Sequence, residues 1–338
     1  MSESLLEKPN VWTELFPALE HLCLSWPYPE PTVSPSEFLG CPALAPRRLR
    51  CIDLEGVSLP ALPQLLLSSR DLIRLYLGQD VLTGDGSLSP ADLPTALSAA
   101  ARLELLHIYL PSNMFHKDEG STDSMLPPSN LVVLPALTFF ESNGSSEYLE
   151  DFVSRINAPL LKRIRVNVSR EPAQPLDILR PSEFISRTER MSWLPCQTFI
   201  FLDKSSTKIS HQFRTRGHIS FELACDQGFF RVPEAIHICG QLSPLMISDA
   251  ERVNIEVNIP PQDPPDETYI MLWLRLFCLF DGTQELELHS KHPLYEAHDS
   301  PTIGQEAFPA LRVLQHDLGL RAPGRSSLSV NSLVDPSP

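Results

Sequence analysis

Apolar residues recur along the chain in a three-position pattern, in which one apolar residue is followed by others three and five positions later. The side chains at the second and third positions share one side of a β-strand, because successive side chains alternate between its two faces. Each match therefore predicts a short strand with one buried face. Full or partial matches begin at Leu19, Leu49, Leu72, Leu103, Leu137, Leu161, Cys196, His218, Ala250, Thr283 and Leu311.

These matches follow one another at intervals of about 29 residues, at the long end of the range for leucine-rich repeats. A single strand–helix unit cannot bury its apolar faces alone, so such units stack on one another. We therefore expect an α/β fold, an irregular leucine-rich-repeat-like solenoid (horseshoe) with a curved, mostly parallel sheet. The expected strands lie near residues 21–25, 51–55, 74–77, 105–109, 138–142, 163–168, 198–202, 219–224, 252–257, 285–289 and 312–316.

The units near residues 196 and 218 are the weakest, and we expect antiparallel pairing there. The first of them, Cys196/Phe199/Phe201, predicts that Phe199 and Phe201 face the core. The polar segment 203–217 between the two units predicts a hairpin-like connection.

The spacers between the expected strands contain helix signals. In the central spacer, Tyr148, Leu149, Phe152, Val153 and Ile156 form one apolar stripe at helical spacing. Further helices are expected over residues 59–69, 89–101, 181–190, 233–240 and 268–280.

The length of 338 residues exceeds what one compact core usually supports. A solenoid removes this conflict because its core grows lengthwise. We therefore expect one domain over residues 1–320, built from about eleven degenerate units. Residues 321–338 have no apolar periodicity, which predicts a disordered tail.

The net charge of −15 argues against nucleic acid as a ligand. The polar N-terminus does not resemble a signal peptide, and the longest apolar stretch, Tyr269–Phe280, is too short to span a membrane. The seven cysteines include no C-x-x-C pair, which is typical of reduced thiols. We therefore expect a cytoplasmic or nuclear protein that binds neither nucleic acid nor membrane.

Three stretches of the chain share a family resemblance: LPALTFFESNGSSEYLEDFVSRINAPLLKRIRV, LRCIDLEGVSLPALPQLLLSSRDLIRLYL and SDAERVNIEV. They resemble the repeat region of fungal (basidiomycete) F-box proteins, from about Phe16 to Leu320. The resemblance implies a horseshoe that selects a protein substrate for a ubiquitin ligase. In the family, a preceding F-box binds a Skp-type adaptor. Residues 1–15 are too few for that module and lack its L-P-x-E-[IL] opening, so we expect no such adaptor to bind.

Motifs for phosphate binding, dinucleotide binding, nucleophilic hydrolysis and zinc proteolysis are absent from the sequence. Ser205–Lys208 matches the S-x-x-K pattern without its companion motifs, and it lies in a polar segment. His289, His292 and His298 form the one histidine cluster, which we interpret as a solvated loop rather than a zinc site. We expect no catalytic residue, metal or cofactor.

If the pattern positions face the core, the alternating positions form the opposite, concave face of the horseshoe. That face mixes aromatic and charged residues, as binding surfaces often do. The candidate partner-binding residues are Arg74, Tyr76, His107, Tyr109, Glu141, Arg163, Arg165, Glu222, Arg252, Glu256, Glu285 and Glu287. Their order predicts a basic centre beside an acidic end.

Two interpretations of function remain open. The first is a protein-interaction scaffold, a substrate-recognition module related to F-box ubiquitin-ligase receptors but without the adaptor-binding F-box. The second is an enzyme whose active site matches none of these motifs. The missing motifs favour the first interpretation.

Overall fold

The computed structural model describes residues 19–25, 48–56, 62–78, 81–82, 88, 92–110, 131–144, 146–170, 179–188, 195–203, 206–213, 218–225, 231–242, 250–258, 267–290, 313–317 and 332–333. The fold is mixed α/β, and its strands pair mostly in parallel. The chain divides into two compact units. Unit 1 comprises Met1–Ile164 and Glu183–Arg190, and unit 2 comprises Arg165–Ser182 and Met191–Pro338. The single-domain solenoid over residues 1–320 stays a prediction.

The strands of unit 1 pair in sequence order, and every pair among the five below is parallel. They are β1 (His21–Ser25), β2 (Cys51–Glu55), β3 (Arg74–Leu77), β4 (Leu105–Leu110) and β6 (Phe139–Gly144). A second, two-stranded sheet joins β5 (Val132–Val133) to β7 (Ile156–Asn157). Strand β8 (Arg163–Arg170) and helix α6 (Leu179–Ser186) each cross the division between the units.

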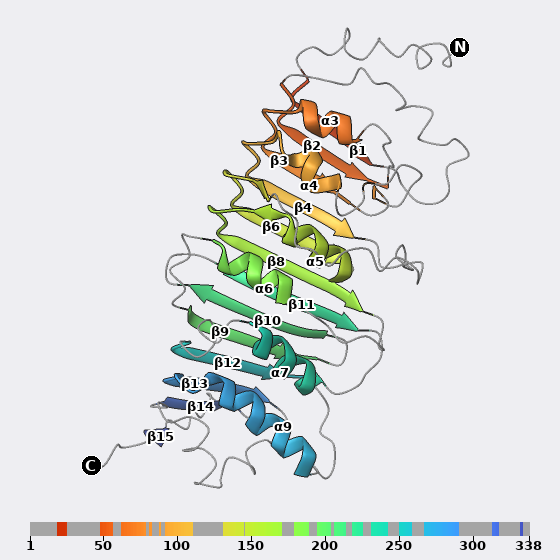
Figure 1. The fold of residues 1–338 in the computed structure, drawn as a ribbon. Coiled ribbons are helices and arrows are strands. Elements are labelled where there is room, and N and C mark those ends of the chain that lie inside the picture. Colours follow the sequence, from red (N-terminus) through yellow and green to blue (C-terminus); the bar gives the residue numbers. More distant parts are fainter. Residues whose placement is uncertain are drawn as a thin grey trace, which may run out of the picture. The chain divides into compact units, whose positions relative to one another are not determined.

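Three helices of unit 1 lie over the same face of its sheet (Figure 1). They are α3 (Leu62–Ser68), α4 (Asp92–Leu97) and α5 (Ser146–Ser154). Four residues of the predicted apolar stripe, from Tyr148 to Val153, lie on α5 and are buried, with Phe152 fully enclosed. The fifth, Ile156, is also buried, but it belongs to β7 rather than to the helix. The Phe152 ring stacks on Phe140 of β6 at 5.8 Å between centroids, and Phe184 of α6 meets Phe140 edge-on at 6.0 Å.

Unit 2 contains an antiparallel insertion between parallel strands, and its last pair, β14 and β15, is also antiparallel. Its strands are ordered β11-β10-β9-β12-β13-β14-β15, and β10 is antiparallel to both of its neighbours, β9 and β11. Their bounds are β9 (Pro195–Leu202), β10 (Ser206–Phe213), β11 (His218–Cys225), β12 (Arg252–Val257), β13 (Glu285–Ser290), β14 (Val313–Asp317) and β15 (Ser332–Leu333). The expected antiparallel pairing near residues 196 and 218 is confirmed.

Helices cover one face of the unit 2 strands (Figure 1). They are α7 (Arg231–Gln241), α9 (Glu267–Phe277) and a short 3₁₀ helix, η2 (Cys278–Phe280). The sequence predicted helices at these places in the chain, with ends that differ by a few residues. Trp273 of α9 is buried and packs on Phe277 at 5.7 Å between centroids.

The three-position pattern correctly identified the buried side chains of most strands. Outside β1, β9, β11 and β14, every apolar pattern position is buried. Two pattern positions are polar, Ser142 of β6 and Thr283 just before β13, and both are also buried. The buried positions are Leu49, Ile52, Leu54, Leu72, Leu75, Leu77, Leu103, Leu106, Ile108, Leu137, Phe140, Ser142, Leu161, Ile164, Val166, Ala250, Val253, Ile255, Thr283, Leu286 and Leu288.

The same backbone hydrogen bond occurs at the start of five of these repeats. The N–H of the first pattern residue donates to the carbonyl oxygen three residues earlier, at 3.0–3.2 Å. The acceptor residue is buried in each case. The donor–acceptor pairs are Leu72–Ser69, Leu103–Ala100, Leu137–Leu134, Leu161–Ala158 and Thr283–Phe280.

A second backbone contact occurs one residue further along in six of the repeats. The two N–H groups that follow the first pattern residue of a repeat both donate to a single carbonyl oxygen of the preceding repeat, at 2.8–3.1 Å. The acceptor is always the residue directly after the first pattern residue of its own repeat. The acceptors are Glu20, Arg50, Ile73, Glu104, Thr138 and Glu251. The repeats that make this contact therefore enter the sheet with the same backbone geometry.

Two predictions in unit 2 were wrong. Residues 203–217 do not form only a connection, because Ser206–Phe213 is strand β10. The face assigned to β9 was also inverted: Ile200 and Leu202 are buried, whereas Phe199 lies 38% exposed. A one-residue shift exchanges the two faces of a strand. The continuous apolar run Phe199–Leu202 gave no alternation to fix the register.

Candidate functional site

In both units, the strand residues that alternate with the buried ones form the surface that we call the open face. The open face lies on the opposite side of the strands from the helices. All twelve residues predicted to bind a partner occupy it, and each is exposed or half-buried. The predicted basic centre beside an acidic end spans both units and stays a prediction.

In unit 1, four polar side chains align across neighbouring strands. The parallel register places Asp53 of β2 beside Tyr76 of β3, Tyr76 beside His107 of β4, and His107 beside Glu141 of β6. The Tyr76 and His107 rings meet edge-on with centroids 4.5 Å apart. These four residues are called the Tyr76 row below.

The contacts of His107 define its tautomer. The Asn143 side-chain amide donates to His107 Nε2 at 2.8 Å, so Nε2 is an acceptor and a neutral ring carries its proton on Nδ1. That Nδ1 lies 3.8 Å from Glu141 Oε2. The carboxylate and the amide thus orient the imidazole from opposite sides.

Carboxylates gather around the Tyr76 phenol. Partial burial raises the pKa of Tyr76, and the negative charges of Glu55, Asp53 and Glu141 raise it further. Burial also raises the pKa of the Cys51 thiol on β2, with Asp53 as the second cause. Neither group is therefore prepared as a nucleophile, since the anionic form is the reactive one.

The basic side chains of the open face are more exposed than the Tyr76 row. Arg74 of β3 and Arg163 and Arg165 of β8 are all exposed. Neither Arg74 nor Arg163 has an ion-pair partner among the described residues. Both guanidinium groups are on the exposed side of their strands.

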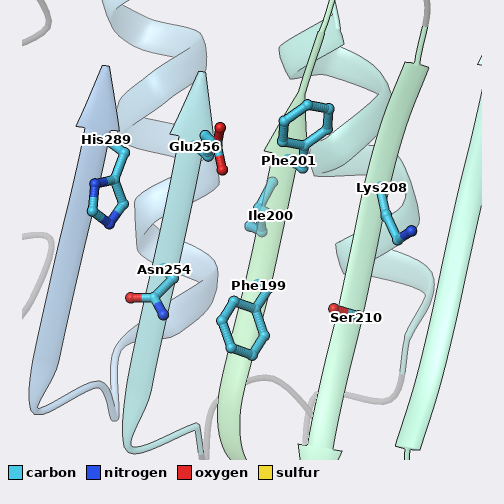
Figure 2. Close-up of a pocket in the computed structure, with 8 residues that line it drawn as sticks. All are labelled: Phe199, Ile200, Phe201, Lys208, Ser210, Asn254, Glu256 and His289. Carbon is cyan, nitrogen blue, oxygen red and sulfur yellow. The ribbon is translucent and has the colours of Figure 1, made fainter. Parts of the chain in front are cut away.

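In unit 2, the open face contains a pocket of about 450 Å³ across strands β10, β9, β12 and β13 (Figure 2). Its floor is formed by the two phenylalanines of β9, Phe199 and Phe201. Cross-strand neighbours lie on each side of them. The lining residues are Phe199, Ile200, Phe201, Lys208, Ser210, Asn254, Glu256 and His289.

Strand register arranges the pocket in two rows. One row runs Lys208–Phe201–Glu256–His289, and the other runs Ser210–Phe199–Asn254–Glu287. Each phenylalanine therefore lies between polar residues on the two adjacent strands.

Several charges around the pocket are already paired within unit 2. Lys208 Nζ lies 3.1 Å from Glu222 Oε2, and Arg252 pairs with Glu285. His289 Nε2 lies 2.9 Å from Glu287 Oε1. Four predicted partner-binding residues, Glu222, Arg252, Glu285 and Glu287, therefore already have a partner within unit 2. Exposed pairs of this kind contribute little to stability.

Of the predicted partner-binding residues, only Glu256 lines the pocket. The sequence interpretation missed Phe199 and Phe201 because it assigned them to the core. The sequence did contain a signal, because Phe199–Leu202 is apolar on both faces of the strand. When helices cover one face of a sheet, apolar residues on the other face are exposed or are covered by another molecule.

Among the described residues, no group of three or more histidine, cysteine or acidic side chains is arranged to hold a metal ion. His289 lies on β13, and His292 and His298 lie outside the described residues. Lys208 of the S-x-x-K match is on β10, whereas Ser205 is outside the described part. Within the described ranges, no helix is both long enough and apolar enough to cross a membrane.

Neither the comparison with protein-family models nor that with curated proteins found a match for this chain. The resemblance to fungal F-box repeat regions therefore rests on the sequence stretches quoted above.

Proposed function

We propose that this chain is a protein-interaction scaffold, an irregular leucine-rich-repeat-like solenoid that binds its partner on the open face. It acts as a substrate-recognition module related to F-box ubiquitin-ligase receptors. The relation to those receptors rests on the sequence resemblance, and a cytoplasmic or nuclear location agrees with it.

The main support is the repeated pair of backbone contacts at the strand entrances. Equivalent carbonyls, from Glu20 to Glu251, accept the same two N–H groups of the next unit. Stacked repeats of this kind present one side chain per strand at equivalent positions, which creates an extended surface suited to a protein partner. The open face supplies aromatic and charged side chains at these positions, such as Tyr76, Arg163 and Glu256.

The enzyme alternative has one observation in its favour, the pairing of His289 with Glu287, which resembles a base held by an orienting carboxylate. A nucleophilic mechanism also needs a hydroxyl or thiol in hydrogen-bond reach of the base. In the described part of the chain, none is bonded to His289. Binding is therefore better supported than catalysis.

The test is the double charge reversal Arg163→Glu/Arg165→Glu. Both side chains are exposed on one strand, so the change should leave the fold intact and abolish capture of the partner from native cell extract. The matched control is Arg70→Glu/Arg275→Glu, which makes the same charge change at exposed positions outside the strands. Circular dichroism checks folding of both variants.

Loss of capture in the open-face variant, with capture retained in the control, supports the proposal. Equal capture by wild type and the folded open-face variant would show that this part of the face is only solvated.

A further inference from the structure

The unit 2 pocket combines two features: adjacent phenylalanine rings that are not in the core, and a carboxylate, Glu256, that has no basic partner among the described residues. Phe199 is 38% exposed, and Phe201 is half-buried beside it on the same face of β9. An exposed aromatic pair on a polar sheet face costs solubility without adding to the core. A ligand that covers the rings accounts for it.

The charges around the two rings are not symmetrical. On the β10 side, the Lys208 ammonium points away from Phe201 (Figure 2) and pairs with Glu222. On the β12 side, Glu256 directs its carboxylate toward Phe201 (Figure 2). Its one described contact is a weak hydrogen bond of 3.3 Å from the Asn258 amide, which is neutral. The side of the pocket next to Phe201 is therefore negative.

The second carboxylate near the pocket increases this asymmetry. Glu287 pairs with His289, whose ring lines the pocket. Neither Glu256 nor Glu287 has a lysine or arginine partner among the described residues. Glu285 lies in the next row, and Arg252 neutralises it. Within the described residues, the pocket thus has an apolar floor and an excess of negative charge on one side.

We propose that the pocket binds an arginine side chain of the partner protein. The aliphatic stem and the guanidinium plane lie over the rings of Phe199 and Phe201, and the guanidinium nitrogens donate to Glu256. This inference rests on the proposed function, because it names the chemistry of the partner segment that the open face recognises.

Arginine fits this pocket better than the other candidate groups. Its guanidinium stacks on aromatic faces, is weakly hydrated and matches a carboxylate with two parallel hydrogen bonds. A lysine ammonium is a compact, strongly hydrated charge that gains less from a flat ring. An acidic group would meet Glu256 and find Lys208 already paired.

The experiment uses the full chain and ligand-observed NMR titration with three acetylated, amidated pentapeptides, Gly-Gly-X-Gly-Gly. X is arginine, its uncharged analogue citrulline, or glutamate. The arginine peptide should bind about tenfold more tightly than the citrulline peptide, as expected for a cation beside a ring and a carboxylate. The glutamate peptide should bind more weakly still.

Two variants test whether the arginine peptide binds in this pocket. Glu256→Gln should reduce the affinity for the arginine peptide to that for the citrulline peptide. Phe201→Leu retains an apolar side chain without an aromatic face, and it should weaken binding of the arginine peptide several-fold while binding of the citrulline peptide changes less. The control Glu104→Gln removes an exposed carboxylate from unit 1 and should change nothing. Thermal denaturation confirms that each variant is folded.

Equal affinity for the arginine and citrulline peptides, or unchanged binding by the folded Glu256→Gln variant, would overturn the inference. So would tighter binding of a single-stranded oligothymidine, since bases also stack on exposed rings. These outcomes are separable from failure of the proposed function. Partner capture that depends on Arg163 and Arg165 tests the scaffold, and the peptide titration tests this pocket.

Discussion

The rings of Tyr76 and His107 meet edge to face across β3 and β4, with their centroids 4.5 Å apart. The parallel register places the two residues directly opposite each other, so equivalent positions of consecutive units form this contact. Cross-strand aromatic pairs of this kind stabilise a sheet and hold its side chains in fixed orientations. The side chains of the Tyr76 row therefore hold fixed orientations without a bound partner.

We predict that neutral His107 carries its proton on Nδ1. The Asn143 amide donates to Nε2, and Glu141 faces Nδ1, so both neighbours favour that tautomer. Long-range ¹⁵N–¹H NMR correlation of the imidazole measures the tautomer directly. In Asn143→Leu the donor to Nε2 is lost, and the Nδ1–H population should fall. A dominant Nε2–H tautomer in the wild type would contradict the predicted hydrogen bond.

Phe152→Ala should lower the free energy of unfolding by about 3–5 kcal/mol. The ring is fully buried on α5, and it stacks on Phe140 of β6, so truncation leaves a cavity behind the sheet. In a stack of repeats, the loss should loosen the neighbouring strands, which hydrogen exchange would detect at residues 137–142 and 161–164. Chemical denaturation gives the free energy.

The control for that measurement is Leu67→Ala on α3. Leu67 is 45% exposed, and its truncation should change stability by roughly 0.5 kcal/mol or less. If Phe152→Ala costs no more than this control, α5 does not contribute to the core of unit 1.

Stability should fall as the pH drops from about 6.5 to about 4, partly because of His211. Its ring is fully buried on β10, with Nδ1 2.9 Å from the Thr198 hydroxyl and no described partner at Nε2. Burial lowers its pKa from 6.5 to about 4, with His218 as a smaller cause. Between these two values the unfolded chain binds the proton and the folded chain does not, so folding is favoured at the higher pH.

As the pH falls from 6.5 to 4, the unfolded chain gains a proton at His211 that the folded chain does not bind, and this difference should lower the free energy of unfolding by about 3 kcal/mol. His211→Gln keeps a polar side chain but does not titrate, so its unfolding free energy should depend less steeply on pH in that window. His237→Gln, which replaces an exposed histidine on α7, is the matched control. A wild-type slope retained in His211→Gln would show that other groups cause the pH dependence.

Cysteine labelling should separate exposed from buried thiols. Cys23 and Cys278 are exposed, whereas Cys239 on α7 is buried and burial raises its pKa well above the usual range. Iodoacetamide at pH 8 should therefore modify the first two in the native protein and Cys239 only after unfolding in denaturant. Peptide mass spectrometry identifies which cysteines are modified. Rapid native modification of Cys239 would contradict its place in the core.

The sequence by itself determined where strands β2, β3, β4 and β6 of unit 1 lie and which of their side chains are buried. It did not predict the short strands β5 and β7. Units such as Leu49/Ile52/Leu54 alternate strictly between apolar and polar residues, and only one register hides the apolar set. The open face follows from the same alternation, so residues such as Arg74 and Tyr76 were placed correctly before the structure was known.

Only the tertiary structure decided the register of β9 and the presence of β10. Phe199–Leu202 is apolar on both faces, so the sequence permits either face to be buried. Pairing with β10, whose Thr207, Ile209 and His211 are buried, fixes the choice and turns Phe199 and Phe201 outward. The pocket then depends on cross-strand neighbours such as Glu256, and contacts between residues about 50 positions apart leave no local signal in the chain.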